Sequence, residues 1–478
     1  MIIYRSLQYL LARGIPGLIN FAALAIYTRL LTAEEFGRYA LVLSIVGLGY
    51  VAGFQWLVLV LGRFVPRSMD RPGPVLKSVL ALFLTSASVV VVGAVIGALL
   101  GSTQSMAWLI MLAAALVVAQ AWHELNLAFA SARIEPVRYG YQLGTKAGLS
   151  LLIGASLAWF GWGTAAPIVG LILGSLSACW LLSAGAWRCN RPRWPSPATL
   201  AEYGAYGLPL AITFALVWLT SSADRLIIAW LIDESATGYY AVGYDLAQQS
   251  LGLLLSIVNT AATPLAIRSL ETDGVDAAAE QMRHNGELVI AVAMAGAAGL
   301  IAVGPLVIDL FVGAEFRAGA RLVFPWIAVT AAVIGIKSFH FDIAFHLTRQ
   351  SRWLMLTSGL AAALGIVLNF LLIPRHGIVG SAWASLGGFS LAAGASALLG
   401  RRVFPMPKAM PLLFKGFAVA VPTYLCAHWA TGWAVRADVQ LALALSVGAV
   451  TAIAACLILD TARLRAALKS GFLRQRSS

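Results

Sequence analysis

Long apolar runs recur along nearly the whole chain, and they constrain its fold more than any other feature of the sequence. An α-helix rises about 1.5 Å per residue, so about 20 apolar residues cross the roughly 30 Å of hydrocarbon in a bilayer. About fourteen such runs are present, at about 8–31, 39–62, 78–100, 107–131, 141–160, 165–187, 205–232, 238–266, 288–312, 322–347, 353–373, 378–399, 412–433 and 440–460. The longest segments between them, 188–203 and 267–287, are too short for a folded soluble domain. The pattern predicts an all-α polytopic membrane protein with about 14 transmembrane helices.

Composition agrees with this prediction. Of the 478 residues, 60% are hydrophobic and 11% are charged, and the mean hydropathy is +0.84, whereas about a quarter of the residues in soluble domains are charged. The opening sequence lacks a small-residue cleavage site after a compact apolar core, so the first run is expected to be an anchor and not a signal peptide. Cys179, Cys189, Cys426 and Cys456 lie far apart without a CxxC pair, which predicts neither a disulfide framework nor a metal site. No cofactor is expected, and the sequence contains no Walker A motif that would bind ATP.

Positive charge concentrates in alternate loops. The formal net charge is +13, and most of the 33 Lys and Arg fall in segments such as RFVPRSMDRPGPVLK, RCNRPR and the final RLRAALKSGFLRQRSS. Short loops rich in Lys and Arg stay on the cytoplasmic side of a membrane, so both termini are predicted to be cytoplasmic. The basic tail is expected to face anionic lipid, and nucleic acid is not an expected partner.

The chain repeats itself. GIPGLINFAA at 14–23 aligns with GLPLAITFAL at 207–216, and FGRYA at 36–40 aligns with TGYYA at 237–241. The period covers six helices, so both halves enter the membrane in the same direction. Two parallel six-helix bundles, 1–203 and 204–402, are expected around a central cavity, followed at 403–478 by two additional helices and a basic cytoplasmic tail. The matched Gly and Pro positions are typical of a transport site, but also of proline tolerated near a helix start.

Cations interrupt several of the apolar runs. A charge at membrane depth is costly and normally faces a bundle interior or water. An excess of cations in a medium of low dielectric constant favours an anion, above all a phosphate or pyrophosphate. The predicted lumen cations, which would bind such a group, are Arg225, Lys146, Arg13, Lys337 and Arg63. Two alternatives stay open: Arg13 lies near enough to the helix end to reach the interface, and Asp224 and Arg225 would also suit structural ion pairs between helices.

Acidic residues inside the same runs are candidates for coupling to H⁺ or Na⁺. They are Asp224, Glu124 and Asp342. His123 and Glu124 are followed by Asn126, and this polar cluster fits either hydrogen bonding between helices or a proton-linked site. With ordinary helical spacing, Asp342 is expected to share a face with His346, and Lys337 to lie on a roughly opposite face.

Three stretches resemble a known family. RLLTAEEFGRYALVLS at 29–44, DRLIIAWLIDESATGYYAVGYDL at 224–246 and LNFLLIPRHGIVGSAWASL at 368–386 are similar to recurring signatures of the polysaccharide-transport, Wzx-like flippases. These flippases belong to the multidrug/oligosaccharidyl-lipid/polysaccharide (MOP) superfamily. The resemblance covers about the first 400 residues, and Asp224 and Arg225 match by position the Asp-Arg pair of the family's seventh span.

The resemblance implies a function. It implies a transporter of the bacterial inner membrane, and not an enzyme, that carries undecaprenyl-pyrophosphate-linked oligosaccharide from the cytoplasmic to the periplasmic leaflet by alternating access. O-antigen or exopolysaccharide units would be the cargo. It further implies a monomer that works with a polysaccharide polymerase and chain-length machinery, and that contacts membrane lipids. Such proteins have a cationic lumen, and coupling to an ion gradient is often proposed for them.

Three competing functions remain from the sequence. A drug or cation exporter of the same superfamily is expected to have an acidic or apolar cavity, and the excess of cations in the apolar runs disfavours this function. A lipid II flippase shares the cationic cavity, although the signatures fit the polysaccharide branch better. A membrane glycan-modifying enzyme would also be basic with many spans, but the periplasmic loops GSTQSM, FGWGT and IDESAT offer little catalytic chemistry.

Overall fold

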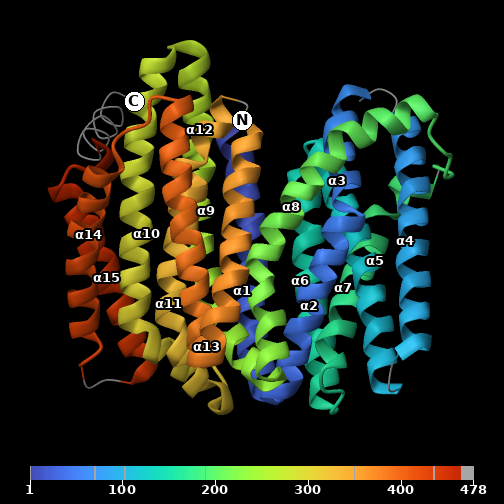
Figure 1. Ribbon diagram of the computed structural model, residues 1–478, viewed down its shortest axis with the longest axis horizontal. Coiled ribbons are helices and arrows are strands. Elements are labelled where there is room, and N and C mark those ends of the chain that lie inside the picture. Colours follow the sequence, from blue (N-terminus) through green and yellow to red (C-terminus); the bar gives the residue numbers. More distant parts are fainter. Residues whose placement is uncertain are drawn as a thin grey trace. The chain divides into compact units, whose positions relative to one another are not determined.

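The computed structural model describes residues 2–68, 72–101, 104–188, 190–348, 350–433 and 436–463, and their regular secondary structure is helical throughout (Figure 1). Within this part of the chain, 11 helices are long and apolar enough to cross a membrane. The two long helices α1 and α6 lie outside that set, and α13 is interrupted at Gly377, where φ is 59°. Counted with them and with α13 as two helices, the described chain contains about fourteen long helices, which confirms an all-α polytopic membrane protein.

Contacts divide the chain into two compact units, Met1–Gly238 (unit 1) and Tyr239–Ser478 (unit 2). The repeat instead predicts divisions at 203 and 402, and these remain predictions. Unit 1 ends later because α8 packs on α2 and α3. The helices of unit 1 are α1 (Ile2–Leu30), α2 (Ala33–Gly53), α3 (Gln55–Phe64), α4 (Gly73–Gly101), α5 (Gln104–Ala132), α6 (Pro136–Trp159), α7 (Ala165–Arg188) and α8 (Pro197–Leu231), with the short η1 (Pro66–Ser68).

Local sequence signals fix several helix boundaries in unit 1. Thr32 and Glu35 form a capping box at the start of α2, which satisfies backbone N–H groups that the helix itself leaves unpaired. Pro136 begins α6 at a position where a missing N–H costs nothing. The predicted second span is broken at Phe54, whose fully buried ring lies in the hydrophobic core of the unit. The bend therefore coincides with the best packed part of unit 1.

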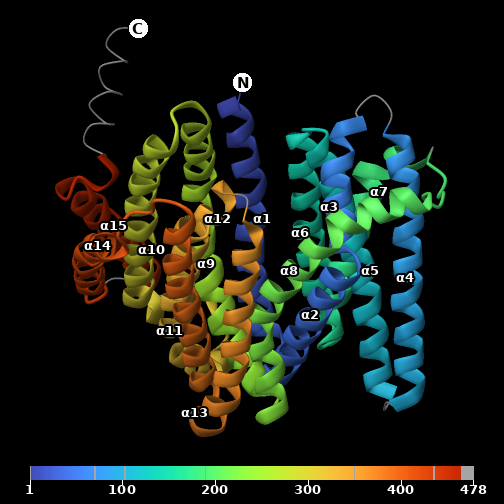
Figure 2. The ribbon, with the colours of Figure 1, turned by 45° about the horizontal axis from the view of Figure 1, so that its top comes forward.

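Unit 2 contains the rest of the fold. Its helices are α9 (Glu234–Thr272, whose first turn belongs to unit 1), α10 (Val275–Phe311), α11 (Arg317–Ile336), α12 (Ile343–Leu347), α13 (Ser351–Val403), α14 (Ala409–Ala430) and α15 (Ala437–Ile458), with the short η2 (Ala314–Phe316) and η4 (Thr461–Arg463). A π-helical turn, Lys337–Phe341, joins α11 to α12. The trailing pair of the sequence prediction corresponds to α14 and α15, which pack on each other and on α10 (Figure 2).

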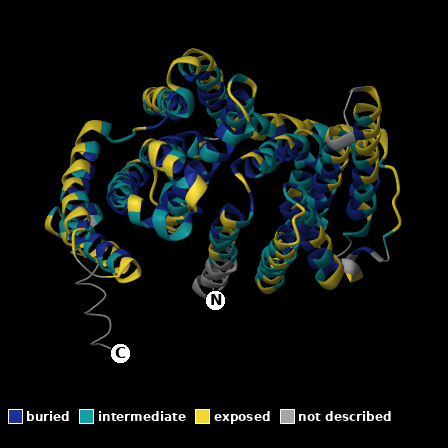
Figure 3. Ribbon diagram, turned by 90° about the horizontal axis from the view of Figure 1, so that it is seen from below, coloured by how far each residue is buried: buried dark blue, intermediate teal, exposed yellow. Residues whose placement is uncertain are grey.

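Burial follows the lipid-facing pattern of a membrane protein. Buried residues lie mainly where helices face one another, and exposed residues cover the outward faces (Figure 3). On α4 the exposed side chains are themselves apolar, among them Val89, Val92, Ile96 and Leu99. Since they recur three or four residues apart, they form one apolar stripe. In water such a stripe would be unfavourable, and in a bilayer it meets lipid chains.

Candidate functional site

Helices α6 and α7 approach each other closely because glycine faces backbone along their contact. A Cβ at Gly170 would lie 2.8 Å from the Gly154 Cα, and a Cβ at Gly174 would lie 2.9 Å from the Lys146 carbonyl oxygen. Real side chains do not fit at these distances, so only glycine permits the contact. This packing fixes the α6 backbone at Lys146 against α7.

A polar cluster surrounds Lys146 inside unit 1. It consists of Lys146 on α6, His123 and Glu124 on α5, and Cys179 on α7, and is called the Lys146 cluster below. The charges of Lys146 and Glu124 interact, and Lys146 also acts electrostatically on His123 and Cys179. The Cys179 Sγ lies 3.8 Å from the His123 Nδ1. The predicted residues Lys146 and Glu124 are thus brought together from two helices.

Exposure differs within the Lys146 cluster. His123 and Cys179 are buried, with 0% and 3% of their surfaces exposed, whereas Lys146 and Glu124 are half-buried. The His123 Nε2 has no hydrogen-bond partner among the described residues. Charges at membrane depth normally face the interior of the helix bundle or water, since a charge in contact with lipid alone would be far costlier.

Asn126, next to the cluster on α5, serves packing. Its Oδ1 accepts a hydrogen bond of 2.8 Å from the Trp187 indole N–H, and its Nδ2 donates to the Trp122 carbonyl. Both of its functional groups are therefore satisfied inside unit 1. This arrangement fits the structural interpretation of Asn126.

Asp224 and Arg225 lie in the last two turns of α8, a helix of 35 residues. Asp224 is buried, with 2% exposed, and Arg225 is half-buried. Both residues have interaction partners in the folded chain, and the Arg225 carbonyl accepts a hydrogen bond from the Thr237 hydroxyl at 3.4 Å. The pair therefore lies about two turns before the end of α8, as its position in the apolar run indicates.

The other two predicted lumen cations of unit 1 lie elsewhere. Arg63 is exposed near the end of α3, where its guanidinium lies 4.2 Å from the ring centroid of Tyr206. This is a cation–π contact with α8. Arg13 belongs to α1, but its side chain lies outside the described residues.

Lys337 forms a buried ion pair in unit 2. Its Nζ lies 2.7 Å from the Asp342 Oδ2, and the Asp342 Oδ1 accepts a hydrogen bond of 2.7 Å from the Ser396 hydroxyl. The expectation that Lys337 and Asp342 lie on opposite faces was wrong. In the π-helical turn the Asp342 N–H donates to the Lys337 carbonyl five residues earlier, and this wider turn brings both side chains to one side.

Glu287 on α10 is a buried carboxylate that the sequence analysis placed at the end of a connector. Only 4% of it is exposed, and it accepts a hydrogen bond of 2.7 Å from the Lys415 ammonium of α14. It also accepts a hydrogen bond of 2.8 Å from the Ala462 backbone N–H, and the Arg283 Nη1 lies 3.6 Å from the Glu287 Oε1. Arg283 and Glu287 are four residues apart on a helix, and this spacing could have predicted their contact from the sequence. It gives no indication of Lys415 or Ala462.

The glycines of the repeated motifs FGRYA and TGYYA, Gly37 and Gly238, lie at a close helix contact within unit 1. A Cβ at Gly37 would clash with the Glu234 backbone, and a Cβ at Gly238 would clash with the Ala33 carbonyl. Beside this contact, the Arg38 guanidinium binds both the Glu234 carboxylate and, at 2.6 Å, the Glu34 carboxylate. The anchors of the repeat are therefore the points where α2 meets the first turn of α9.

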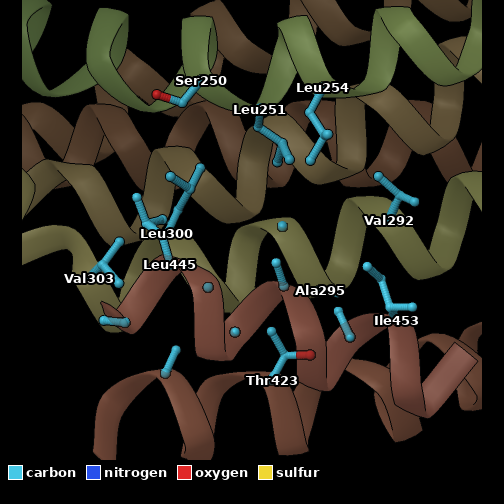
Figure 4. A pocket seen from close by; sticks show the side chains of 17 residues that line it. Ser250, Leu251, Leu254, Val292, Ala295, Leu300, Val303, Thr423, Leu445 and Ile453 are labelled. Atoms are coloured by element: carbon cyan, nitrogen blue, oxygen red, sulfur yellow. The ribbon is translucent and has the colours of Figure 1, made fainter. Parts of the chain in front are cut away.

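An apolar groove lies in unit 2 among α9, α10, α14 and α15. It has a volume of about 330 Å³. Figure 4 shows Leu251 and Leu254 of α9 facing Val292 of α10 and Ile453 of α15 across it. Its two hydroxyl groups are satisfied within their own helices, since Ser250 donates to the Leu246 carbonyl and Thr423 to the Val419 carbonyl. The groove therefore presents an apolar lining to any molecule that occupies it.

Solved structures share this fold over most of the chain. A lipid II flippase, MurJ, in an inward closed conformation matches with a TM-score of 0.75 and 10% identity, over 95% of this chain and 98% of that one. An inward-facing multidrug resistance MATE transporter of the MOP superfamily matches with a TM-score of 0.63 and 13% identity, over 82% and 97%. A MOP superfamily transporter from Pyrococcus furiosus, described as having a binding pocket of reversed polarity, matches with a TM-score of 0.55 and 14% identity, over 84% and 94%. At these identities the matches show the fold.

Sequence comparison identifies the family. No curated protein matches the chain. The family model described as "Polysaccharide biosynthesis protein" matches residues 26–320, which is more than half of the chain. The resemblance inferred from the three sequence signatures is thereby confirmed at the level of the polysaccharide biosynthesis family. This protein belongs to the polysaccharide biosynthesis protein family, and it is a multi-pass membrane protein whose fold is that of solved MOP superfamily structures.

Proposed function

We propose that the protein is a flippase that moves a lipid-linked oligosaccharide, joined to its polyprenyl chain by pyrophosphate, between membrane leaflets by alternating access. Polysaccharide biosynthesis calls for a lipid-linked glycan substrate, and a MOP transporter provides the means of moving it. The observation that carries the proposal is the Lys146 cluster, a half-buried cation held inside unit 1 by glycine contacts.

Lys146 is the pyrophosphate ligand in this proposal. Of the predicted lumen cations, Lys337 is neutralised by Asp342, and Arg63 is exposed at a helix end. The charge of Lys146 meets that of Glu124, a single carboxylate. A pyrophosphate carries more negative charge than one carboxylate and has more acceptor oxygens, so it competes well for the ammonium. Arg225, half-buried near the end of α8, is the second proposed ligand.

Glu124 is the proposed coupling residue. When the pyrophosphate binds Lys146, the Glu124 carboxylate loses its counter-charge in a site of low dielectric constant. Binding of H⁺ to Glu124 then becomes more favourable. Asp342 is less suited to this role because Lys337 and Ser396 already occupy both of its oxygens. Asp224 is the remaining candidate.

The groove of unit 2 is the proposed site of the polyprenyl chain. Its lining is apolar and its hydroxyls are satisfied internally, so an isoprenoid chain loses no hydrogen bonds on entering. A water-soluble sugar nucleotide would find no hydrogen-bonding partners on such a surface. This favours a lipid-linked substrate over a free one.

The setting follows from the charge pattern. We place the protein in the bacterial inner membrane as a monomer, with both termini in the cytoplasm, because the positive loops favour that orientation. Its product on the outer leaflet would be the substrate of a polysaccharide polymerase with its chain-length machinery.

Reconstitution tests the proposal. Wild type, Lys146→Gln and Arg225→Gln are placed in liposomes containing a fluorescent polyprenyl-pyrophosphoryl oligosaccharide, and transfer between leaflets is followed under H⁺ and Na⁺ gradients. Loss of one charge-assisted contact is expected to slow transfer about 10-fold to 100-fold. Arg436→Gln is the matched control, since this exposed arginine contacts only the nearby Asp438 among the described residues. Wild-type rates in both lumen variants, or no transfer by folded wild type, would refute the proposed function.

A further inference from the structure

Helix α9 has a polar face in the middle of its length. The helix has 39 residues and is therefore about 58 Å long, far more than the roughly 30 Å of hydrocarbon in a bilayer. Its central part contains Asp245, Gln249, Ser256, Asn259 and Thr263, spaced four, seven, three and four residues apart. This spacing places them on one side of a helix. The sequence analysis assigned no role to this face.

Leucines on the other sides of α9, which begin next to the polar face, provide much of its packing. Leu251 and Leu254 point into the apolar groove (Figure 4), and Leu255 packs where Gly335 of α11 lacks a side chain. Leu251 and Leu255 are each 1% exposed, whereas Gln249 is exposed and Asn259 and Thr263 are half-buried. The polar side chains are therefore not the ones that hold α9 in unit 2.

The two carboxamides of this face, Gln249 and Asn259, need water or a polar ligand at membrane depth, whereas the Ser256 hydroxyl donates to the Leu253 carbonyl. Lipid chains cannot accept or donate hydrogen bonds, so carboxamides in contact with them would be left unsatisfied. The Gln248 Oε1, beside the face, is buried and accepts no hydrogen bond from any described residue. A helix that only packed against other helices or contacted lipid would not require these carboxamide groups.

The chemistry of the face selects sugars over phosphate. Between Glu234 and Arg268 the only charged residue of α9 is Asp245, and a carboxylate repels pyrophosphate. Carboxamides and hydroxyls both donate and accept hydrogen bonds, as sugar hydroxyls do. The Thr263 hydroxyl donates to the Asn259 Oδ1 at 2.7 Å. That bond fixes the orientation of the carboxamide and directs its two N–H donors to a further acceptor.

We propose that the polar face of α9, Gln249, Asn259 and Thr263 at its centre, binds the glycan of the substrate through its hydroxyl and amide groups. The inference rests on the proposed function, since it assigns the glycan part of the lipid-linked substrate to α9. Specificity for the carried sugar then depends on this helix, and Lys146 does not contribute to that specificity.

Two lipid probes separate these roles. Polyprenyl pyrophosphate bearing an N-acetylglucosamine-containing disaccharide and the same lipid without sugar are followed between leaflets in liposomes, separately and in competition. Wild type is expected to prefer the disaccharide lipid. Gln249→Ala and Asn259→Ala should each lower that preference about fivefold, the effect of one lost neutral hydrogen bond, and leave transfer of the sugar-free lipid unchanged. Gln440→Ala, which removes a carboxamide of α15 bonded to the Thr431 carbonyl, is the matched control and should retain the preference.

The outcomes are distinguishable. Equal losses with both lipids in the α9 variants would indicate a structural role and overturn the inference, as would an unchanged preference or a wild type that treats the two lipids alike. Failure of the proposed function would instead appear as no transfer of either lipid by folded wild type. Thermal unfolding of each purified variant identifies a folding defect. Because Gln249 is exposed, its variant should fold even if Asn259→Ala does not.

Discussion

Lys146 and Lys337 are both lysines inside apolar runs, and the sequence gives no reason to treat them differently. In the folded chain, Lys146 is half-buried among groups from α5 and α7, with its charge opposed by Glu124. Lys337 is 5% exposed and bound at 2.7 Å to Asp342, which Ser396 also holds. The second lysine has its partner fixed by a backbone turn, whereas no such turn fixes a partner for the first. Under the proposed function, burial and partner geometry, more than charge itself, would separate a binding cation from a structural one.

The largest expected effect breaks the structural pair. Asp342→Ala leaves the Lys337 ammonium buried without its partner, which should destabilise unit 2 by about 3–5 kcal/mol. Thermal unfolding of the purified protein in detergent measures this loss. Asp309→Ala, which breaks the exposed pair with Arg321, is the control and should cost about 1 kcal/mol or less. Similar stability of the two variants would contradict the distinction between the lysines.

Lys146→Gln should show the opposite pattern. Because Lys146 is half-buried and forms no ion pair within the described chain, losing its interaction with Glu124 should cost less than breaking the Lys337–Asp342 pair, about 1–2 kcal/mol. Transfer of a polyprenyl-pyrophosphoryl glycan should nevertheless fall at least about tenfold. Lys146→Arg, which retains the charge, should restore part of the rate. A variant that unfolds as readily as Asp342→Ala would place Lys146 among the structural cations.

Gly174→Ala tests whether packing positions Lys146. The added Cβ would lie 2.8 Å from the Ser150 N and 2.9 Å from the Lys146 carbonyl, so α6 and α7 must separate. We expect a loss of about 1–3 kcal/mol in stability and a severalfold lower transfer rate. Gly97→Ala on α4, where a Cβ meets nothing within 4 Å, provides the matched comparison. Equal transfer by both alanine variants would show that the glycine contact does not position Lys146.

The smallest effect is expected when both members of the structural pair are replaced. Lys337→Met with Asp342→Leu removes both charges together, so no buried charge is left uncompensated. Stability should recover most of the loss seen in Asp342→Ala, and transfer should stay within about twofold of wild type if the pairing with Asp342 keeps Lys337 from binding substrate. A double variant as unstable as Asp342→Ala would mean that the charges act separately and not as a pair.

The membrane fold could be predicted from the sequence because it depends on the apolar pattern, which is regular and local. Partners of charged residues were harder to predict. The π-helical turn at Lys337 shifts the helical register by one residue, and no feature of the apolar pattern marks that shift. Glu287 escaped notice because its main partner, Lys415, lies 128 residues later on α14. Such pairings depend on how helices pack, which the periodicity of one helix does not determine.

The turn after α15 sets a minimum length for this protein. Ala462 adopts a left-handed conformation, with φ of 56°, and from there its backbone N–H reaches the Glu287 carboxylate across to α10. A chain cut after Ile458 would retain every apolar residue of the last helix and still lose this backbone donor. A chain cut after Arg463 would retain it. Shortened forms should therefore be designed by hydrogen bonding and not by hydropathy.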